Sequence, residues 1–338
     1  MSRYEFKFGQ YTTNVNFYSL EDIIPGNGSL FVADENTSYL IPKELMDKTI
    51  ILKSGEENKT WESIEAILNK AIELELGRDG LFVGVGGGVI CDMTAFAASL
   101  FMRGCSVTLV PTTLLAMCDA ALGGKTGIDF KNYKNLVGAF YPATELRIGV
   151  DTLKTLGKRE FLSGMGEVFK TAMIGDKSLL TYLKNKKDSI LALDKESLEY
   201  MINSCIKVKG EIVEADLYER GIRAHLNLGH TFGHALETVT GFKDFSHGEG
   251  VVWGIAKSIE TSLLLNIIDE DYAKKVIDLL KEYKYRLKAD VDAVEILSAM
   301  KHDKKKKGGV IRFILQTAPQ ETIIREVPED IILKVVRT

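Results

Sequence analysis

Short apolar runs alternate with longer segments of helical period over the first 150 residues. The apolar, β-prone runs span residues 29–33, 49–52, 81–85 and 106–110. Between them, residues 61–76 and 89–102 place their apolar side chains on one helical face. Strands that alternate with helices at this pitch predict βαβ units and a mostly parallel sheet.

The pattern changes near residue 151, where helical periodicity takes over. Apolar and charged positions follow the helical repeat over residues 160–174, 178–193, 198–216, 231–240, 249–265 and 271–284. Strand-like runs return only at 310–315 and 322–324. A chain of 338 residues exceeds one ordinary core. We therefore predict an α/β N-terminal domain (1–150), a mainly α-helical C-terminal domain (151–338) and a ligand site in the crevice between them.

Composition narrows the class of protein. The chain is 45% hydrophobic and 27% charged with a net charge of −4, which argues against nucleic acid as a partner but allows local basic pockets. The four cysteines form no C-x-x-C pair, which indicates a reduced compartment. The N-terminus has no signal-peptide core and no apolar stretch reaches spanning length. We expect a cytoplasmic protein with no membrane partner.

Three consecutive glycines at 86–88 separate the strand predicted at 81–85 from a helix that carries Asp92. Such a turn lets the backbone approach a ligand closely, and the helix N-terminus offers free N–H groups to a phosphate. The spacing is not the usual G-x-G-x-x-G, because Val89 occupies the third glycine position counted from Gly84. A tight turn without a ligand is the alternative.

Polar residues follow three other predicted strands. They are Asp34 and Asn36 after the first strand, Glu56 and Lys59 after the second, and Thr112 and Thr113 after the fourth. Ligands of open parallel sheets bind beyond the carboxyl ends of the strands. These residues therefore favour a nucleotide crevice at that edge.

A glycine-rich segment at 119–135 lies between apolar flanks, and we predict an irregular loop there. It holds Asp119, Lys125, Lys134 and Asn135. The two lysines occur beside glycines rather than on charged helical faces, which favours a binding role. The other candidate cations, taken singly, are more typical of solvated surface charge. They are Arg103, Lys170, Lys209, Arg223 and Lys304, the last in a run of four lysines.

All five histidines lie in the last third of the chain, and His230 and His234 share one helical face. Zinc binds nitrogen and oxygen ligands. His247 can add another imidazole, and Glu167 can add a carboxylate. The spacing is equally compatible with an inert pair, and it does not decide whether His230 or His234 ligates.

Several blocks of residues together resemble the 3-dehydroquinate synthases of the sugar phosphate cyclase family. In order, they are Gly86-Gly87-Gly88-x3-Asp92, Arg103-Gly104, Pro111-Thr112-Thr113-Leu114-Leu115-Ala116, Gly123-Gly124-Lys125-Thr126, Lys134-Asn135, Glu167-x2-Lys170 and Asn227-x-Gly229-His230-Thr231-x-Gly233-His234. The resemblance runs from about Asp34 to His247, with weaker similarity to Lys304. Separate blocks in register are far more specific than any one motif.

The resemblance implies a Rossmann-like N-terminal domain and the cofactors NAD and a divalent metal. It assigns zinc, with cobalt as the other candidate, to Glu167, His230 and His247. It assigns NAD to Asp34, Asn36, Glu56, Lys59, Gly87, Gly88, Asp92, Thr112, Thr113, Lys125, Lys134, Thr155 and Leu156. It assigns the sugar phosphate substrate to Arg103, Asp119, Lys125, Lys134, Asn135, Lys170, Lys209, Arg223, Asn227, His234 and, less directly, Lys304.

The activity that the resemblance implies belongs to the shikimate pathway of aromatic amino acid biosynthesis. 3-Deoxy-D-arabino-heptulosonate 7-phosphate becomes 3-dehydroquinate and phosphate, and NAD is restored in every cycle. We expect His234 to carry protons at the reacting hydroxyl. The family's habit also implies a homodimer. Asp129, Gly149 and Gly157 depart from frequent family residues, which affects local geometry rather than chemistry.

Three alternatives remain. A metal-dependent polyol dehydrogenase of the glycerol type does not need the cations around Lys125 and Lys134. Another sugar phosphate cyclase acts on a substrate without the carboxylate, so Lys209, Arg223 and Asn227 favour the synthase. A non-enzymatic NAD-binding module has no physical reason to keep the predicted ligand set.

Overall fold

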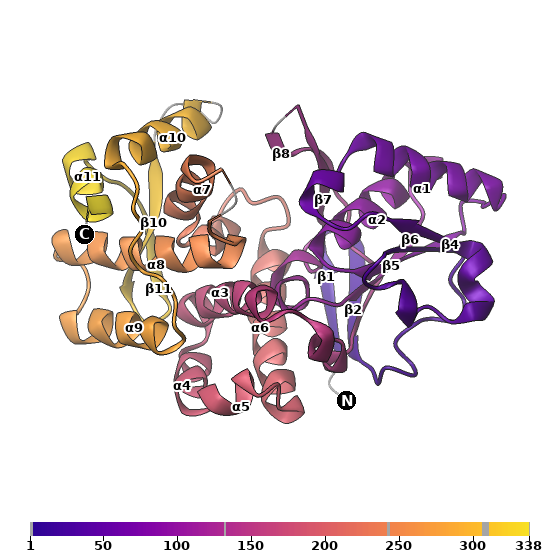
Figure 1. The fold of residues 1–338 in the computed structure, drawn as a ribbon, viewed down its shortest axis with the longest axis horizontal. Coiled ribbons are helices and arrows are strands. Elements are labelled where there is room, and N and C mark those ends of the chain that lie inside the picture. The colour runs from indigo at the N-terminus through magenta and orange to yellow at the C-terminus, as the bar shows by residue number, and fades with distance from the viewer. Residues whose placement is uncertain (1–2, 132, 242–243, 306–310, 338) are drawn as a thin grey trace. The chain divides into compact units, whose positions relative to one another are not determined.

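The computed structural model describes residues 3–131, 133–241, 244–305 and 311–337, which form two compact units (Figure 1). Unit 1 comprises Met1–Leu156 and Leu198–Glu219, and unit 2 comprises Gly157–Ser197 and Arg220–Thr338. Most of helix α6 (Lys195–Ala215) therefore belongs to unit 1. The two functional domains, with their boundary at residue 150, stay a prediction.

Unit 1 is built on a seven-stranded sheet in the order β1-β2-β9-β6-β5-β3-β4, in which only the β1–β2 pair is antiparallel. The strands are β1 (Arg3–Phe8), β2 (Tyr11–Phe17), β3 (Leu30–Asp34), β4 (Thr49–Leu52), β5 (Leu81–Gly86), β6 (Ser106–Pro111) and β9 (Glu145–Ile148). The predicted α/β class is confirmed, and the four predicted strands match β3 to β6 within one residue at each end.

Burial explains why these four strands could be recognised. The strand β5 is buried from Phe82 to Gly86, since parallel sheets have both faces covered and give continuous apolar runs. Helix α2 (Gly88–Leu100) is buried along most of its length, and α1 (Trp61–Glu73) begins at Thr60, whose hydroxyl accepts a hydrogen bond from the Ser63 N–H.

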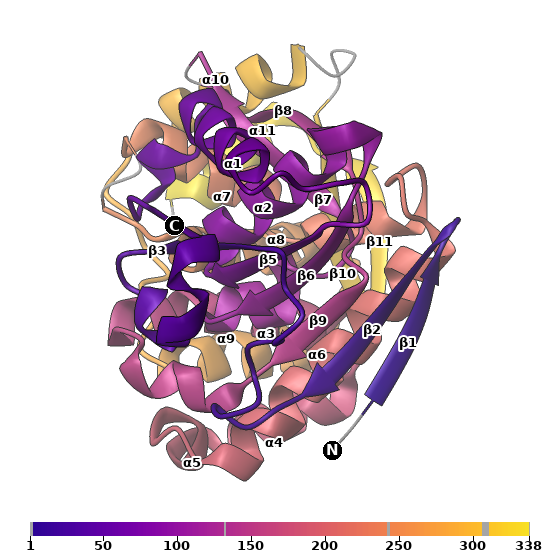
Figure 2. The same cartoon turned by 90° about the vertical axis from the view of Figure 1, so that its right-hand side faces the viewer.

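An N-terminal hairpin, β1–β2, forms one edge of the sheet, and the apolar pattern did not predict it (Figure 2). Phe6 and Phe8 on β1 are buried, and Phe6 fills the space beside Gly210 of α6, where a Cβ would overlap its ring. The edge is protected because Glu214 accepts a hydrogen bond from the Lys7 N–H. Because of this packing, most of α6 belongs to unit 1, although it follows helices of unit 2 in the chain.

The segment predicted as an irregular loop is instead largely a two-stranded antiparallel sheet, β7 (Lys125–Phe130) and β8 (Tyr133–Phe140). That prediction was wrong, and Lys125 and Lys134 lie on strands. Gly123 and Gly124, just before β7, have φ values of 110° and 69° in the left-handed region, whereas Gly127 serves close strand pairing. Gly127 pairs with Gly138, and a Cβ on Gly127 would lie 2.6 Å from the Val137 carbonyl oxygen.

Unit 2 is mainly helical, as predicted. Its described elements are α3 (Lys158–Gly175), α4 (Lys177–Asn185), α5 (Lys187–Leu191), the start of α6, α7 (His230–Val239), α8 (His247–Leu264), α9 (Glu270–Glu282), α10 (Ala293–Lys305), β10 (Arg312–Ala318), β11 (Glu321–Glu326) and α11 (Glu329–Arg337). The helix predicted at 178–193 is divided at Lys186, and the pattern missed α10 and α11. Val310, Lys306 and Lys307 lie outside the described residues.

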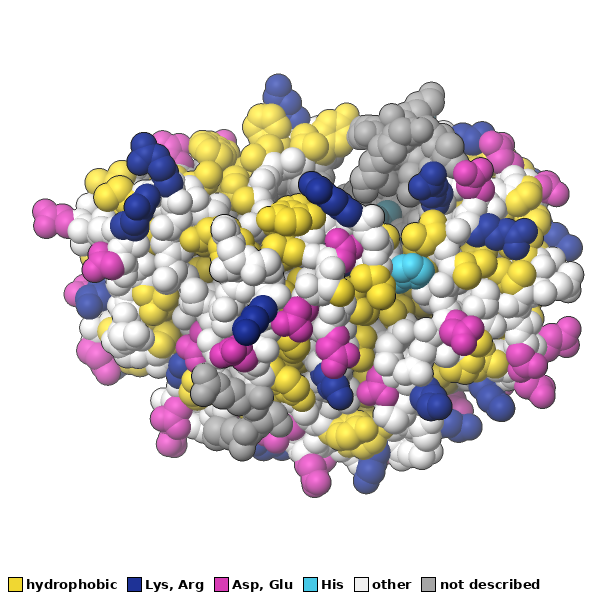
Figure 3. Space-filling model, turned by 180° about the vertical axis from the view of Figure 1, so that it is seen from behind, with side chains coloured by type: hydrophobic (Ala, Val, Ile, Leu, Met, Phe, Trp, Pro, Cys, Tyr) yellow, Lys and Arg dark blue, Asp and Glu magenta, His cyan; other side chains and the backbone are white. Residues whose placement is uncertain are grey.

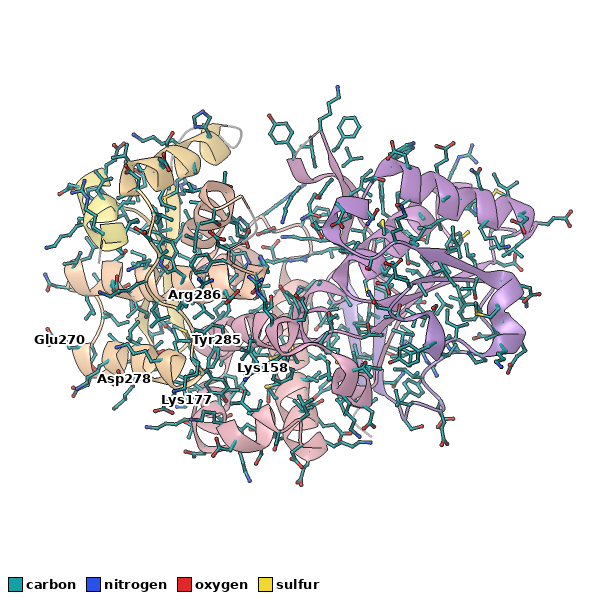
Figure 4. All side chains as sticks on the ribbon, viewed as in Figure 1. Lys158, Lys177, Glu270, Asp278, Tyr285 and Arg286 are labelled. Carbon is teal, nitrogen blue, oxygen red and sulfur yellow. The ribbon has the colours of Figure 1, made fainter. Side chains whose placement is uncertain are left out.

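Aromatic residues after α9 tie it to the preceding helices. The Tyr285 hydroxyl donates to the Leu162 carbonyl of α3, and the Tyr283 hydroxyl donates to the Leu183 carbonyl of α4 at 2.7 Å. The Phe169 ring meets the Tyr283 ring edge to face at 4.9 Å between centroids. Tyr285 is buried, while Glu270 and Asp278 of α9, labelled in Figure 4, are exposed. These contacts fix the position of α3 against the segment that follows α9.

Glycines allow three helices of unit 2 to cross with their backbones in contact. A Cβ on Gly254 of α8 would overlap the Gly229 carbonyl before α7, and one on Gly248 would overlap the Ser163 carbonyl of α3. A Cβ on Gly233 of α7 would lie 2.8 Å from the Gly250 carbonyl oxygen. The side chains at these crossings are therefore brought unusually close together.

The surface carries both signs of charge. On the face in Figure 3, lysines and arginines are interspersed with aspartates and glutamates, and exposed hydrophobic side chains occur between them. Among the described helices, none has the length and apolar character needed to cross a membrane.

We predict that Gly254→Ala destabilises the protein by about 1–3 kcal/mol or more, because the added methyl group separates α7 from α8. Gly157→Ala is the matched control, since nothing lies within 4 Å of its Cβ position. Urea denaturation of both variants measures the difference. Equal stability of the two variants would contradict the close crossing.

Candidate active site

Helix α3 supplies an acidic and a basic side chain from one face. Glu167 and Lys170 are three residues apart, almost fully buried, and form an ion pair. A buried charge is costly unless it is paired, so these two groups stabilise one another in the core of unit 2. Their position on a rigid helix fixes the carboxylate in space.

Helix α7 begins at His230, directly after Gly229, whose φ of 81° is in the left-handed region. His230 Nδ1–H donates to the Leu228 carbonyl at 3.3 Å, which leaves Nε2 available on the other side of the ring. His234 and Glu237 lie one and two turns further along α7. Because the spacing is four and then three residues, all three side chains share one face.

Helix α8 begins at His247, and a capping box fixes this start. The Ser246 hydroxyl accepts a hydrogen bond from the Glu249 N–H, and the Glu249 carboxylate accepts one from the Ser246 N–H at 2.8 Å. Arg159 and Arg286, the latter labelled in Figure 4, lie 3.3 and 3.9 Å from the same carboxylate. The first turn of α8 is therefore firmly defined.

The three helices bring Glu167, His230 and His247 together. The Glu167 Oε1 atom lies 3.1 Å from His247 Nε2 and 3.6 Å from His230 Nε2. The ligand atoms of the three residues all lie within 4.8 Å of one another. Two imidazole nitrogens and one carboxylate oxygen in this arrangement match the donors that a catalytic zinc prefers, with a further position left for water or substrate.

Electrostatics divide the roles of the two histidines. Burial holds the pKa of His230 well below its ordinary value, so its ring is neutral. Burial acts in the same direction on His247, but hydrogen bonds to Glu167 and Glu237 outweigh it and raise the pKa of His247 to about 10. Burial opposes ionisation of Glu167, yet the Lys170 ammonium and His247 hold the pKa of Glu167 well below its ordinary value.

The remaining predicted residues of unit 2 lie outside the Glu167, His230 and His247 cluster. His234 is exposed, with its ring centroid 5.2 Å from that of His230 and 6.1 Å from that of His247. Arg223 is only 2% exposed, and the Asn227 amide donates to the Ala224 carbonyl at 3.2 Å. Lys304 lies on α10.

Unit 1 joins three predicted residues through the ammonium of Lys59. Lys59 Nζ donates to Asp92 Oδ2 and to Asn135 Oδ1, both at 2.6 Å. Burial raises the pKa of Asp92 to about 6 although the Lys59 ammonium opposes the change. Asp129 completes the link, because its carboxylate accepts from the Asn135 N–H and its N–H donates to the Lys59 carbonyl. Residues assigned to NAD and to substrate therefore touch within this unit.

The glycine turn forms the N-terminus of α2, with Gly87 as its N-cap. A Cβ on Gly87 would lie 3.1 Å from Thr113 Cγ2, and one on Gly88 would lie 3.3 Å from Ala120 Cβ. At the end of β3, the Asp34 carboxylate accepts from the Asn36 N–H at 2.9 Å. These groups lie at the carboxyl ends of adjacent parallel strands, where a nucleotide binds.

The other predicted residues of unit 1 have contacts outside the group formed by Lys59, Asp92 and Asn135. Lys209 pairs with Asp119, and Lys125 pairs with Glu219. Arg103 is exposed in a turn where Met102, Arg103 and Gly104 all have positive φ. The Thr155 hydroxyl lies 3.3 Å from that of Tyr39. Glu56 and Lys134 lie on η3 (Glu56–Asn58) and β8, Thr112 follows β6, and Leu156 follows η6 (Val150–Thr155).

Two carboxylates in these clusters were not predicted from the sequence. Glu219 contacts Lys125 across 94 residues, a separation that no local pattern reveals. Glu237 contacts His247, and its spacing from His230 and His234 on one helical face was a signal that could have identified it. The sequence prediction singled out the histidines and left the acid on the same face unassigned.

Two family models match the chain in succession. Residues 49–163 match the 3-dehydroquinate synthase N-terminal model, and residues 164–306 match the 3-dehydroquinate synthase C-terminal model. Among curated proteins, the 3-dehydroquinate synthase of Dichelobacter nodosus is 42% identical over 88% of this chain and 81% of its own length.

Two solved structures share the fold. A 2-epi-5-epi-valiolone synthase from Streptomyces hygroscopicus subsp. jinggangensis 5008, with NAD+ and Zn2+ bound, is 22% identical with a TM-score of 0.88 over 98% of this chain and 97% of that chain. A 2-deoxy-scyllo-inosose synthase complexed with carbaglucose-6-phosphate, NAD+ and Co2+ is 24% identical with a TM-score of 0.86 over 99% of both chains. On the family models and the curated relative, this chain belongs to the 3-dehydroquinate synthase family.

Proposed function

We propose that the protein converts 3-deoxy-D-arabino-heptulosonate 7-phosphate to 3-dehydroquinate and inorganic phosphate, as an NAD- and metal-dependent carbon–oxygen lyase. The observation that carries this proposal is the donor set of Glu167, His230 and His247 beside the buried Lys170, in a chain of this family. When bound, the metal would supply Lewis acidity at a substrate hydroxyl, and NAD would accept and return a hydride.

The donor set fits a divalent metal. Its three ligand atoms come from three helices and lie within 4.8 Å of one another, and they combine two imidazole nitrogens with a buried carboxylate, which are donors that zinc prefers. Zinc is our first choice and cobalt the second. The solved relatives carry one or the other of these ions.

The groups at the strand ends of unit 1 fit NAD. Gly87 leaves a space at the N-terminus of α2 that a Cβ would fill against Thr113, and this terminus offers backbone N–H groups to a diphosphate. Asp34, Asn36 and Asp92 supply polar groups for ribose and nicotinamide. We assign Glu56, Lys59, Gly88, Thr112, Thr113, Lys125, Lys134, Thr155 and Leu156 to the same binding site, as the family resemblance implies.

The remaining polar side chains would bind and orient the substrate. Arg103, Lys125 and Lys170 neutralise its phosphate, while Lys209, Arg223 and Asn227 hold its carboxylate and hydroxyls. Asp119, Lys134, Asn135 and Lys304 complete the proposed substrate set. His234 lies one turn beyond His230 on α7 and its side chain is exposed, so its imidazole can exchange a proton with a substrate hydroxyl and with solvent.

The carboxylate-binding residues also separate this reaction from its nearest rival. A cyclase that acts on a sugar phosphate without a carboxylate has no use for Lys209, Arg223 and Asn227 together. Arg223 is almost fully buried, a setting that strengthens a hydrogen bond between its guanidinium and a carboxylate. Separately, we propose that the protein forms a homodimer, as the family resemblance implies.

The first prediction concerns the products. Each substrate molecule consumed should release one phosphate while NADH does not accumulate, because the hydride is returned. A phosphate assay run with NADH absorbance measures both, with and without a chelator. A heptose 7-phosphate that lacks the carboxylate should be turned over poorly. Accumulation of NADH without phosphate release would indicate a dehydrogenase.

The second prediction concerns the ligand set. His230→Ala should lose the bound metal and nearly all activity, because it removes one of three donors. His302→Ala is the control, since that exposed histidine lies on α10 outside the cluster. Elemental analysis of both purified variants measures metal content. A metal-free but fully active His230→Ala variant would refute the assignment.

The third prediction follows from the raised pKa of His247. The metal-free ring is protonated near neutral pH, so a metal must displace a proton from Nε2. Titration calorimetry in buffers of different ionisation enthalpy should detect about one proton released per metal bound. The metal affinity should fall as the pH is lowered. Metal binding without proton release would contradict the protonated state.

A further inference from the structure

Glu237 is a buried acid on the same face of α7 as His230 and His234. Its side chain is only 6% exposed, and Oε1 lies 2.9 Å from His247 Nδ1. A carboxylate is seldom buried unless a partner compensates it. The substrate and cofactor assignments above give this residue no role.

The two ring nitrogens of His247 face two different carboxylates. Nε2 points to Glu167 at 3.1 Å, within the proposed ligand set, and Nδ1 points to Glu237 on the opposite side of the ring. A carboxylate can only accept, so Nδ1 must carry the hydrogen of that bond. Once a metal displaces the Nε2 proton, the neutral ring keeps its hydrogen on Nδ1, bonded to Glu237, and presents Nε2 to the metal.

We propose that Glu237 is a positioning residue of the metal centre, which acts through His247 rather than as a ligand. Its carboxylate accepts the Nδ1–H hydrogen bond, holds the orientation of the ring and increases the basicity of Nε2. The proposal deepens the proposed function, because it depends on the metal site assigned there.

His247 needs this support more than His230 does. The His230 ring is largely enclosed and donates Nδ1–H to the Leu228 carbonyl of its own chain segment. The His247 side chain is 37% exposed and is the first residue of α8. A side chain at a helix start with an open flank keeps several rotamers unless a hydrogen bond selects one.

The glycine crossing makes the contact between Glu237 and His247 feasible. The Cβ position of Gly250 lies 3.4 Å from both Cγ and Oε1 of Glu237, so a larger side chain there would displace the carboxylate. Gly233 and Gly250 also let α7 and α8 approach backbone to backbone. The acid thus reaches the ring from the neighbouring helix across a short, well-defined gap.

A different role for Glu237 would be as a ligand itself. The ligand atoms of His234, Glu237 and His247 also lie within 4.8 Å of one another. Positioning is favoured because His234 is exposed, whereas Glu167 in the other set is fully buried. The separation of 2.9 Å between Nδ1 and Oε1 is also that of a direct hydrogen bond.

The test uses the full-length protein with Glu237→Gln and Glu237→Ala, and Glu282→Gln as a control on an exposed part of α9. Competition with a chromophoric chelator gives the zinc affinity, which should fall about 10- to 100-fold for Glu237→Ala and less for Glu237→Gln. The amide oxygen of glutamine can still accept the Nδ1–H bond. The control should bind zinc like the unmodified protein.

Two further measurements distinguish positioning from a general structural defect. NAD affinity, which depends on unit 1, should stay within about twofold in both variants. Nitrogen NMR of the metal-loaded protein should show His247 with Nδ1–H in the unmodified chain and a mixture of ring states in Glu237→Ala. Unchanged zinc affinity in Glu237→Ala, or an equal loss in the control, would overturn the proposal. If Glu237→Ala does not fold, Glu237→Gln decides by the same affinity criterion.

Metal counting separates the remaining outcomes. Two zinc ions per chain, or zinc kept by His230→Ala but lost by Glu237→Gln, would make Glu237 a ligand and overturn the positioning role. Absence of zinc binding in the unmodified protein would instead overturn the proposed function. One zinc that is lost with His230 and weakened with Glu237 is the expected result.

Discussion

The close crossing of α3, α7 and α8 in unit 2 is the constraint on which the candidate metal centre depends. Glycines at 229, 248 and 254 let carbonyl groups of one segment occupy the space where a neighbouring residue would carry a side chain. Helices that pack through ordinary side chains keep their axes about 8–10 Å apart. The closer approach places two helix starts and the middle of a third helix around one small volume.

The close packing of these helices also determines the charges of the cluster. Because Glu167 is buried among helices, its negative charge requires compensation, which Lys170 supplies from the same helix and His247 from another. The same burial keeps His230 neutral and ready to donate an electron pair. The cluster is thus organised for a cation before any cation binds, at the cost of holding a proton on His247.

In unit 1, a buried charge with partners on separate elements also holds polar groups in place. Its parallel strands end in polar groups that share one edge, and Lys59 joins Asp92 to Asn135 of the β7–β8 sheet. A buried lysine between two acceptors fixes both of them, so groups assigned to NAD and to substrate are held in a common frame. Gly127 and Gly138 permit the tight strand pairing that carries Asn135 there.

The sequence by itself determined that an α/β part precedes a mainly helical part. Buried parallel strands give continuous apolar runs and amphipathic helices give a helical repeat of apolar residues, and both patterns are visible within a short stretch of sequence. It also identified Glu167, His230 and His247 as candidates, since their residue types and blocks carry chemistry. The tertiary structure alone decided that Lys125 and Lys134 lie on strands, that α6 returns to unit 1 and that Glu237 touches His247. Each of these depends on a contact between separate helices or strands, which the apolar period of a single element does not specify.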